Sequence, residues 1–557
     1  MKKRALTNNI KTGYLVFFLA LVIATWSQYH SFTNKYLLAY DFHRHSFWMQ
    51  QLRDPSLFRG DPLTDYSKHH EPPGFIALYY FLSFFTDPLL ASKIIPLFLF
   101  ALSALYLFKL VLLIADTRTA FLAGTLFIVS SFYFEQMVGG LPRAFATPLM
   151  ILFIYYLMRG KYARSSSILV AQALFYPVIF FESLLTYLLV MIDKARKKDL
   201  PDAFTRHRKI FLAAIAISLF ILSMKYVFTD PAVGTLVMRA QIATDRDLTI
   251  PARYLSPPKW SDLTGLLVSY IDCSSVFLHK ICGLLASAGW GNGIMLITLF
   301  SAGLLLSLLA RSHSRKALLP HEIIFLLSAG FIMFYVADAL LFVLYLPTRQ
   351  LHYILPMTIL ILSAVVVGRM VISVNNPRLR NTIYGLIILL AFSNRGIHRN
   401  IGLLDYSAYH GLYSYIGSLP EDALIAAPPD IADGIPTFSF RKVFLTRASA
   451  DTIYDHHSKL IKKRFYDFYR SYYSKDPGPI YDFCERNGID YIVVDIKKFL
   501  NDTPSREIAF LKDEPLASIL NGTLTGGKKF ALMKIPDHDK LFMGDGIFVI
   551  KKDALSR

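Results

Sequence analysis

The chain has 557 residues, of which 54% are hydrophobic, 14% aromatic and only 18% charged. This composition is too apolar for a soluble protein of this length, so it predicts a polytopic membrane protein. The net charge is +19, yet residues 396–557 hold 22 Lys and Arg against 21 Asp and Glu. The positive excess therefore lies in the apolar part of the chain. That distribution indicates basic cytoplasmic loops and excludes a nucleic-acid-binding surface.

The first apolar run extends from Gly13 to about Ser27 and follows a basic N-terminal stretch. It lacks a small-residue cleavage site, so we expect a retained first helix with a cytoplasmic N-terminus. Several of the later runs are shorter than the roughly 20 residues of a full span. We predict about 10–12 membrane helices. The later runs lie near 74–86, 88–114, 119–134, 144–158, 165–192, 210–228, 283–310, 322–345, 350–372 and 382–394.

The run 165–192 is interrupted by Pro177 and has basic residues on both flanks. Because basic flanks remain in the cytoplasm, this run is predicted to be a hairpin of two short helices. The basic segments 194–209, 311–316 and 369–380 are then also cytoplasmic. The segments between them fall on the outer side, namely 30–73, 135–143, 229–282 and 346–350.

The last part of the chain has a different pattern. Short apolar stretches at 423–427, 442–446, 488–495 and 546–550 are typical of buried strands. The segments 451–474 and 479–487 between them are predicted helices. We therefore divide the chain into a membrane domain, 1–395, and a soluble extracytoplasmic α/β domain, 396–557.

Asp41 follows the first predicted helix and begins a predicted amphipathic helix over 41–53. Taken alone, this carboxylate fits an ordinary helix N-cap. An ionised Asp at the outer mouth of an apolar bundle is costly unless it is paired or functional. It is also able to take a proton from an acceptor hydroxyl during group transfer. The surrounding polar segments favour this catalytic role.

A second polar cluster follows in the same outer segment, with Asp61, Asp65, His69, His70 and Glu71 close together. Such a cluster can bind a substrate or a divalent cation. It also fits a hydrogen-bonded loop whose Asp-Pro and Pro-Pro-Gly sequences form turns. The spacing matches no metal-binding signature, so we favour the loop and expect no metal or cofactor, while a divalent cation stays possible.

Two arginines begin apolar runs on the outer side. Arg143 follows Gly139-Gly140, where the backbone can approach a ligand and a helix start favours an anion. Arg349 repeats this arrangement with His352 in the next helical turn. These side chains either hold a phosphate or pyrophosphate together or extend to the membrane interface, as arginines commonly do.

The long outer segment 229–282 is either a mobile substrate loop or a plain surface loop. Cys273 and Cys282 lie near this segment and either form a disulfide or stay reduced, and Cys484 completes the set of three cysteines. None of them belongs to a C-x-x-C motif.

These features together resemble the GT-C superfamily of integral-membrane glycosyltransferases. The resemblance rests on Asp41 before a surface helix, the polar loop that follows it, the broken hairpin, Arg349 and the C-terminal outer domain. It implies an inverting transferase that moves a hexosyl or pentosyl group from a polyprenyl-phosphate donor. The acceptor would be a lipid, a polysaccharide or a protein.

The chain departs from two branches of that superfamily. Protein O-mannosyltransferases carry Asp-Glu where this chain has Asp41-Phe42. Oligosaccharyltransferase catalytic subunits carry a W-W-D-type motif in the soluble domain, and residues 396–557 contain no Trp. The chain is more similar to single-Asp bacterial transferases of the inner membrane, which decorate lipopolysaccharide or surface polymers.

The resemblance implies that Asp41 is the general base and that Arg349 and Arg143 hold the leaving phosphate. His352, Asp61, Asp65, His69 and Glu71 are the further candidates for substrate binding. Two other functions stay open: a transporter or flippase for a lipid-linked saccharide, and a non-catalytic assembly protein. A transporter would gather polar residues such as Glu182 and Asp338 near the membrane midplane with repeat symmetry. Here most polar groups lie in the outer loops.

Overall fold

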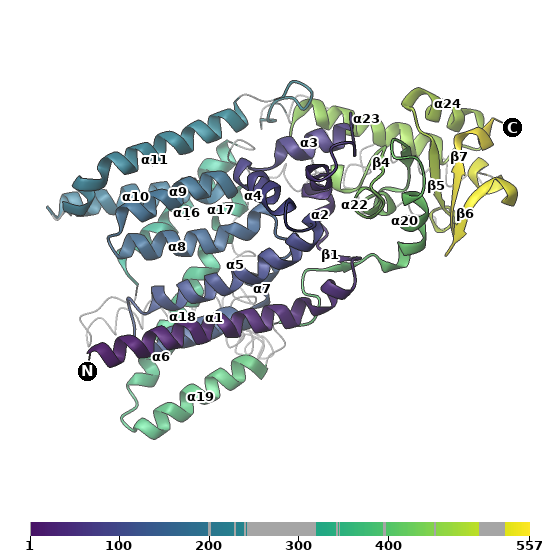
Figure 1. Ribbon diagram of the computed structural model, residues 1–557. Coiled ribbons are helices and arrows are strands. Elements are labelled where there is room, and N and C mark those ends of the chain that lie inside the picture. Colours follow the sequence, from purple (N-terminus) through teal and green to yellow (C-terminus); the bar gives the residue numbers. More distant parts are fainter. Residues whose placement is uncertain are drawn as a thin grey trace, which may run out of the picture.

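The structure is a computed structural model of the chain. It describes residues 2–198, 202–227, 230–238, 241, 319–340, 344, 346–393, 397–450, 453–500 and 530–556. A helical bundle forms one end of the molecule, and a mixed sheet with its own helices forms the other (Figure 1). The predicted run 283–310, the basic segment 311–316, Cys273, Cys282 and most of segment 229–282 lie outside the described residues.

The bundle is built from helices of very different lengths. In chain order they are α1 (Lys2–Thr33), α4 (Pro73–Ser83), α5 (Pro88–Val111), α6 (Thr117–Val129), α7 (Ser131–Glu135), α8 (Ala146–Met158), α9 (Tyr162–Phe175), α10 (Val178–Arg196), α11 (Asp202–Tyr226), α16 (His321–Ala339), α17 (Pro347–His352), α18 (Ile354–Ile372) and α19 (Pro377–Ser393). Helix α1 packs along α5 and α6, and α9 packs between α8 and α11.

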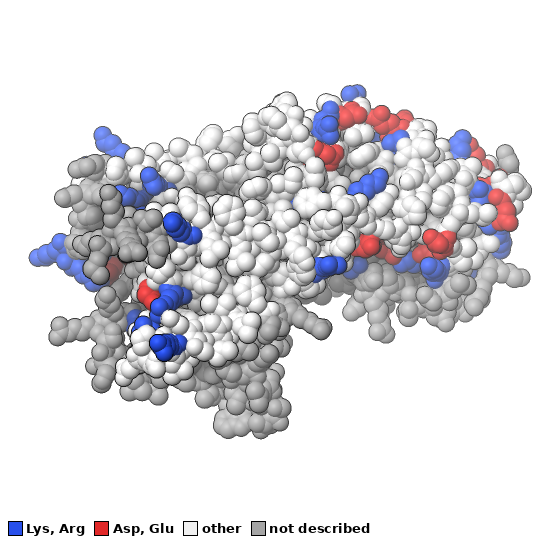
Figure 2. Space-filling model, turned by 60° about the horizontal axis from the view of Figure 1, so that its bottom comes forward, with Lys and Arg blue, Asp and Glu red and all other residues white. Residues whose placement is uncertain are grey.

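Five helical stretches in the described part of the chain are long and apolar enough to cross a membrane. They are Asn9–Thr33, Pro88–Val111, His207–Tyr226, His321–Ala339 and Pro347–Ile372. Large apolar side chains remain exposed on the bundle, as Phe84, Phe220 and Leu389 illustrate. On the face shown in Figure 2, Lys, Arg, Asp and Glu gather at the two ends of the molecule and leave an almost uncharged belt between them. The predicted polytopic helical fold class is confirmed.

The hairpin predicted within 165–192 is present as α9 and α10. The two helices meet at Tyr176 and Pro177, where Tyr176 takes an extended conformation. Pro177 has no backbone N–H and therefore ends α9 while starting α10 with a favourable φ. The break leaves Tyr176 and Pro177 facing a cavity rather than lipid.

Short elements connect α1 to the bundle and lie between the bundle and the sheet. They are β1 (Leu37–Leu38), α2 (Phe42–His45), the 3-10 helix η1 (Phe47–Leu52) and α3 (Pro62–His70). The single helix predicted over 41–53 is wrong, because the chain leaves helical geometry at Ser46. Phe47, Trp48 and Met49 are buried all the same.

The C-terminal sheet has the strand order β4-β3-β5-β7-β6. Its strands are β3 (Leu424–Ala426), β4 (Lys442–Val443), β5 (Tyr491–Asp495), β6 (Lys540–Gly544) and β7 (Ile547–Lys551). Strand β3 pairs in parallel with β4 and β5, whereas β7 runs antiparallel to β5 and β6. The four predicted strands are confirmed, and β6 was missed because its residues alternate between half-buried and exposed.

Helices surround this sheet. They are α20 (His410–Gly417), α21 (Pro429–Ala432), α22 (Gly434–Ser439), α23 (Asp455–Tyr472), α24 (Gly478–Asn487) and α25 (Lys497–Leu500). The helices predicted over 451–474 and 479–487 correspond to α23 and α24. Strand β2 (Leu404–Asp405) pairs with β1 and so joins the end of α1 to the start of the sheet region.

Close helix packing inside the bundle depends on glycine. A Cβ added at Gly368 in α18 would lie 2.2 Å from Thr119 Oγ1 of α6. Gly385 in α19 has open space at the same position. Small residues of this kind let membrane helices approach closely and gain van der Waals contact.

We expect Gly368→Ala to lower the free energy of unfolding by roughly 1–3 kcal/mol, since the added methyl forces α6 and α18 apart. Gly385→Ala is the matched control and should change stability by no more than about 1 kcal/mol. Thermal unfolding of both variants in the same detergent checks this. Equal stability of the two variants would contradict the packing argument.

Candidate functional site

A cavity of about 370 Å³ opens where α10, α11 and α17 meet the connecting elements. One wall is polar and is formed by His45, His70, Glu71, Arg143 and Arg349. The other wall is apolar. Its residues come from α9–α11 and neighbouring segments, and include Tyr176, Pro177, Val178, Phe181, Leu219, Leu222, Tyr226, Leu236 and Ile453. The cavity therefore offers a charged end and a hydrophobic end to one ligand.

Asp41 does not itself line the cavity, but it forms an ion pair with Arg143, which does. Although Asp41 precedes α2, its side chain makes no capping hydrogen bond. Burial raises the pKa of Asp41, but the positive charges of Arg143, His45 and Arg44 outweigh burial and lower it to about 2. The carboxylate is thus ionised over the whole physiological pH range.

A tight turn positions Arg143. Gly139 and Gly140 both have positive φ, which only glycine adopts at little cost. The buried Tyr79 donates a hydrogen bond of 3.1 Å to the Gly140 carbonyl and locks this turn against α4. The 3-10 helix η2 (Pro142–Phe145) follows directly, so Arg143 projects from a rigid corner.

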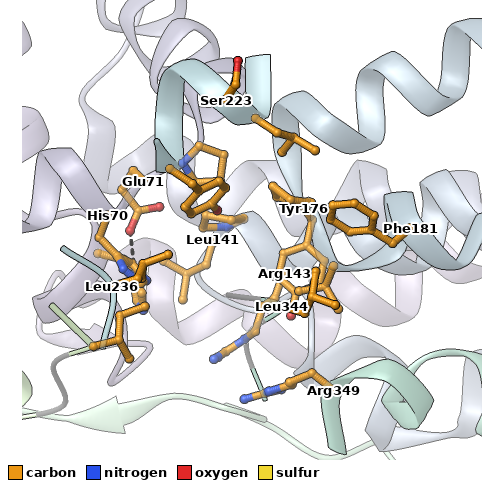
Figure 3. A pocket seen from close by; sticks show the side chains of 18 of the residues that line it. His70, Glu71, Leu141, Arg143, Tyr176, Phe181, Ser223, Leu236, Leu344 and Arg349 are labelled. Atoms are coloured by element: carbon orange, nitrogen blue, oxygen red, sulfur yellow. Dashed lines mark hydrogen bonds and ion pairs between the residues drawn. The ribbon is translucent and has the colours of Figure 1, made fainter. Parts of the chain in front are cut away.

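Arg349 reaches the same cavity from α17. Its neighbour Gln350 is buried and donates a 2.9 Å hydrogen bond to the Leu344 carbonyl, which holds the start of this short helix. Figure 3 shows the guanidinium groups of Arg143 and Arg349 on the same side of the cavity, with Tyr176 and Phe181 beside them and Glu71 across from them. Two guanidinium groups in one cavity form a site for an anion such as phosphate.

No family model matches the chain, and no curated protein matches it in sequence. Solved structures match in fold. The apo oligosaccharyltransferase of Archaeoglobus fulgidus is 12% identical, with a TM-score of 0.52 over 88% of this chain and 70% of its own. The chain has a GT-C fold. The same archaeal enzyme, AglB, in complex with an inhibitory peptide and a dolichol-phosphate is also 12% identical and gives a TM-score of 0.45 over 87% and 69% of the two chains.

The GT-C fold predicted from the sequence is therefore confirmed, although the C-terminal region lacks the Trp-containing motif named above.

The predicted site residues separate into two groups. Arg143, Arg349 and Glu71 line the polar end of the cavity, and Asp41 is paired with Arg143. The remaining candidates do not line it.

Asp61 caps α3, because its carboxylate accepts hydrogen bonds from the Leu63 and Thr64 backbone and from Thr64 Oγ1. Asp65 is exposed on the same helix. His69 packs its ring against Tyr454, with 5.2 Å between ring centroids.

His352 packs between Phe132 and Tyr353, with centroid distances of 5.2 and 4.9 Å. It does not line the cavity. The polar wall instead includes His45 and His70, which were not among the proposed site residues. Nothing in the local sequence around His45 indicates a binding residue, because only the fold of the loop between them brings His45 to Glu71.

The sheet domain packs on the loop that carries Asp41. His43 Nδ1 lies 2.8 Å from Thr437 Oγ1, and the Tyr66 and His457 rings stack at 3.8 Å. Tyr40, next to Asp41, shares a hydrogen bond with the buried Asp433. The Arg447 guanidinium lies 5.6 Å from the centre of the Tyr40 ring.

Burial raises the pKa of Asp433 from its ordinary value of 3.8 to about 7, even though Ala448 N–H donates a 2.9 Å hydrogen bond to it. A raised pKa favours folding only while the group is protonated. This stability is complete below about pH 4 and is lost as the pH rises through about 7. We expect Asp433→Asn to remove that loss, which is worth about 1.4 kcal/mol for each unit of pKa shift.

Unfolding measured from pH 5 to pH 8 checks this expectation. The difference in stability between Asp433→Asn and the native chain should grow in favour of the variant as the pH rises. A difference that is constant with pH would contradict the assignment.

Proposed function

We propose that the chain is an inverting glycosyltransferase that moves a sugar from a polyprenyl-phosphate donor to an acceptor hydroxyl on the extracytoplasmic side of the membrane. One observation carries this proposal: Arg143 and Arg349 line the polar end of a cavity whose other wall is apolar, and Arg143 forms an ion pair with Asp41. The GT-C fold supports it further. The orientation follows the basic loops, which place the sheet domain outside.

The two ends of the cavity match the two ends of such a donor. The donor phosphate would bind Arg143 and Arg349, and the first isoprene units would lie along Tyr176, Phe181 and Leu222. Burial of these units contributes about 25 cal/mol for each Å² of apolar surface removed from water. The charged pair selects the phosphate, and the apolar wall selects the lipid.

The reaction needs one base and no separate acid. The acceptor hydroxyl oxygen attacks the anomeric carbon, Asp41 takes the hydroxyl proton, and the bond from that carbon to the phosphate oxygen breaks. The leaving group is already a phosphate, whose charge the two guanidinium groups stabilise. Attack from the face opposite the phosphate inverts the anomeric configuration.

The donor would have a second role, because its phosphate would compete with Asp41 for the Arg143 guanidinium group. While Arg143 binds Asp41, the carboxylate is a weak base. A donor phosphate competes for the same guanidinium group and so weakens its hold on Asp41. The base therefore becomes effective only when the donor is in place, which limits unproductive hydrolysis.

The purified chain should transfer sugar from a matching polyprenyl-phosphate donor in a panel of radiolabelled donors and acceptors. Asp41→Asn should lower kcat by about 10²–10⁴-fold, the range for a general base. Arg349→Ala should lower it by about 10²–10³-fold, as expected for one lost electrostatic stabiliser.

Asp54→Asn and Arg59→Ala are matched controls, because both side chains are exposed in the same loop and lie outside the cavity. They should keep the native rate. Transfer that survives Asp41→Asn at the native rate would rule out Asp41 as the base. Donor that crosses the bilayer of a vesicle without transfer would favour the flippase.

In the native chain, protonation of Asp41 should not reduce kcat/KM above about pH 3, since its pKa is about 2. Arg143→Gln removes the main charge that lowers this pKa, while burial still raises it. The acidic limb of the kcat/KM profile should therefore move to higher pH. An unmoved limb would show that Arg143 does not control the protonation of Asp41.

A further inference from the structure

A second group of side chains meets at the polar wall, beside the ion pair of Asp41 and Arg143. His45 ends α2, His70 ends α3, and Glu71 follows directly. One potential ligand atom from each of the three lies within 4.8 Å of the other two. All three residues line the cavity.

Hydrogen bonds at the backbone hold these side chains in place. Trp48 Nε1 donates to the His45 carbonyl at 3.0 Å. Lys225, at the end of α11, donates from Nζ to the Glu71 carbonyl at 2.5 Å and also to the His69 carbonyl. The buried Trp48 and the hydrogen bonds from Lys225 thus hold the group from two separate elements.

The hydrogen bonding within the group is incomplete. His45 Nδ1 lies 2.5 Å from Glu71 Oε1. The Glu71 side chain is fully buried, and its Oε2 has no hydrogen-bond partner among the described residues; the same holds for His70 Nδ1. A buried polar atom without a partner costs about 1–3 kcal/mol. A ligand that accepts lone pairs from these atoms would remove that cost.

We propose that His45, His70 and Glu71 bind one divalent cation of the zinc class. Two imidazoles and one carboxylate are a common ligand set for Zn²⁺, and three protein ligands leave one position open. Because the three residues line the cavity, a ligand bound there could occupy that position.

The site differs from the cluster considered in the sequence. Asp61 and Asp65 take no part in it, and His45 joins from 26 residues before Glu71. Asp41 is not a ligand, because it pairs with Arg143. The charges of Arg44 and Lys225 disfavour a cation with few negative ligands, so an anionic fourth ligand should strengthen binding. If the proposed function holds, the donor phosphate supplies that ligand.

Metal binding tests this proposal without any sugar donor. The full-length protein in detergent is stripped with a chelator and titrated with ZnCl₂ by calorimetry, and Co²⁺ absorption reports the ligand geometry. We expect one equivalent of Zn²⁺ to bind and Co²⁺ to show the intense bands of a tetrahedral site. Inorganic phosphate should raise the affinity by filling the open position.

Glu71→Gln and His70→Asn should each weaken Zn²⁺ binding by about 100-fold or more, since even second-shell changes cost about 10–100-fold. His69→Asn is the matched control, because this neighbouring histidine lies outside the group and should leave the affinity unchanged. Thermal unfolding confirms that the variants are folded. No Zn²⁺ binding by the native chain, or equal binding by all three variants, would overturn the site. Neither result depends on transferase activity.

Discussion

The ion pair between Asp41 and Arg143 is the contact around which the site is built. It joins the loop after the first helix to a rigid glycine turn of the bundle, at the border between charged and apolar surroundings. An isolated charge at this border would be costly, and pairing offsets much of that cost. The same pairing keeps the carboxylate ionised and the guanidinium group pointed into the cavity.

The sheet domain has a structural part in this arrangement. Its residues Thr437 and His457 contact the loop that carries Asp41, and Leu236 pairs with Tyr454 by an antiparallel bridge close to the cavity. Strand β1 after the first helix pairs with β2 before the sheet. The domain thus covers one side of the polar wall, and this explains why a loop with few regular elements can hold charged groups in place.

A different constraint determines the helical bundle. In an apolar environment, backbone N–H and C=O groups must form hydrogen bonds within the chain, and this restricts the apolar part to helices. At the α9–α10 break, Tyr176 and Pro177 line the cavity. Close contacts through Gly368 and similar residues hold the helices together.

Local pattern was enough to predict the helical class, the broken hairpin at Pro177 and four strands of the sheet, and it singled out Arg143 and Arg349, which line the cavity. These features depend on hydropathy, proline geometry or charge in an apolar setting, all of which act within a few residues. The partner of Asp41 and the meeting of His45 with Glu71 depend on residues far apart in the chain. Only the tertiary structure decided them, because the side-chain contacts follow from how the loop folds against α4, α11 and the sheet domain.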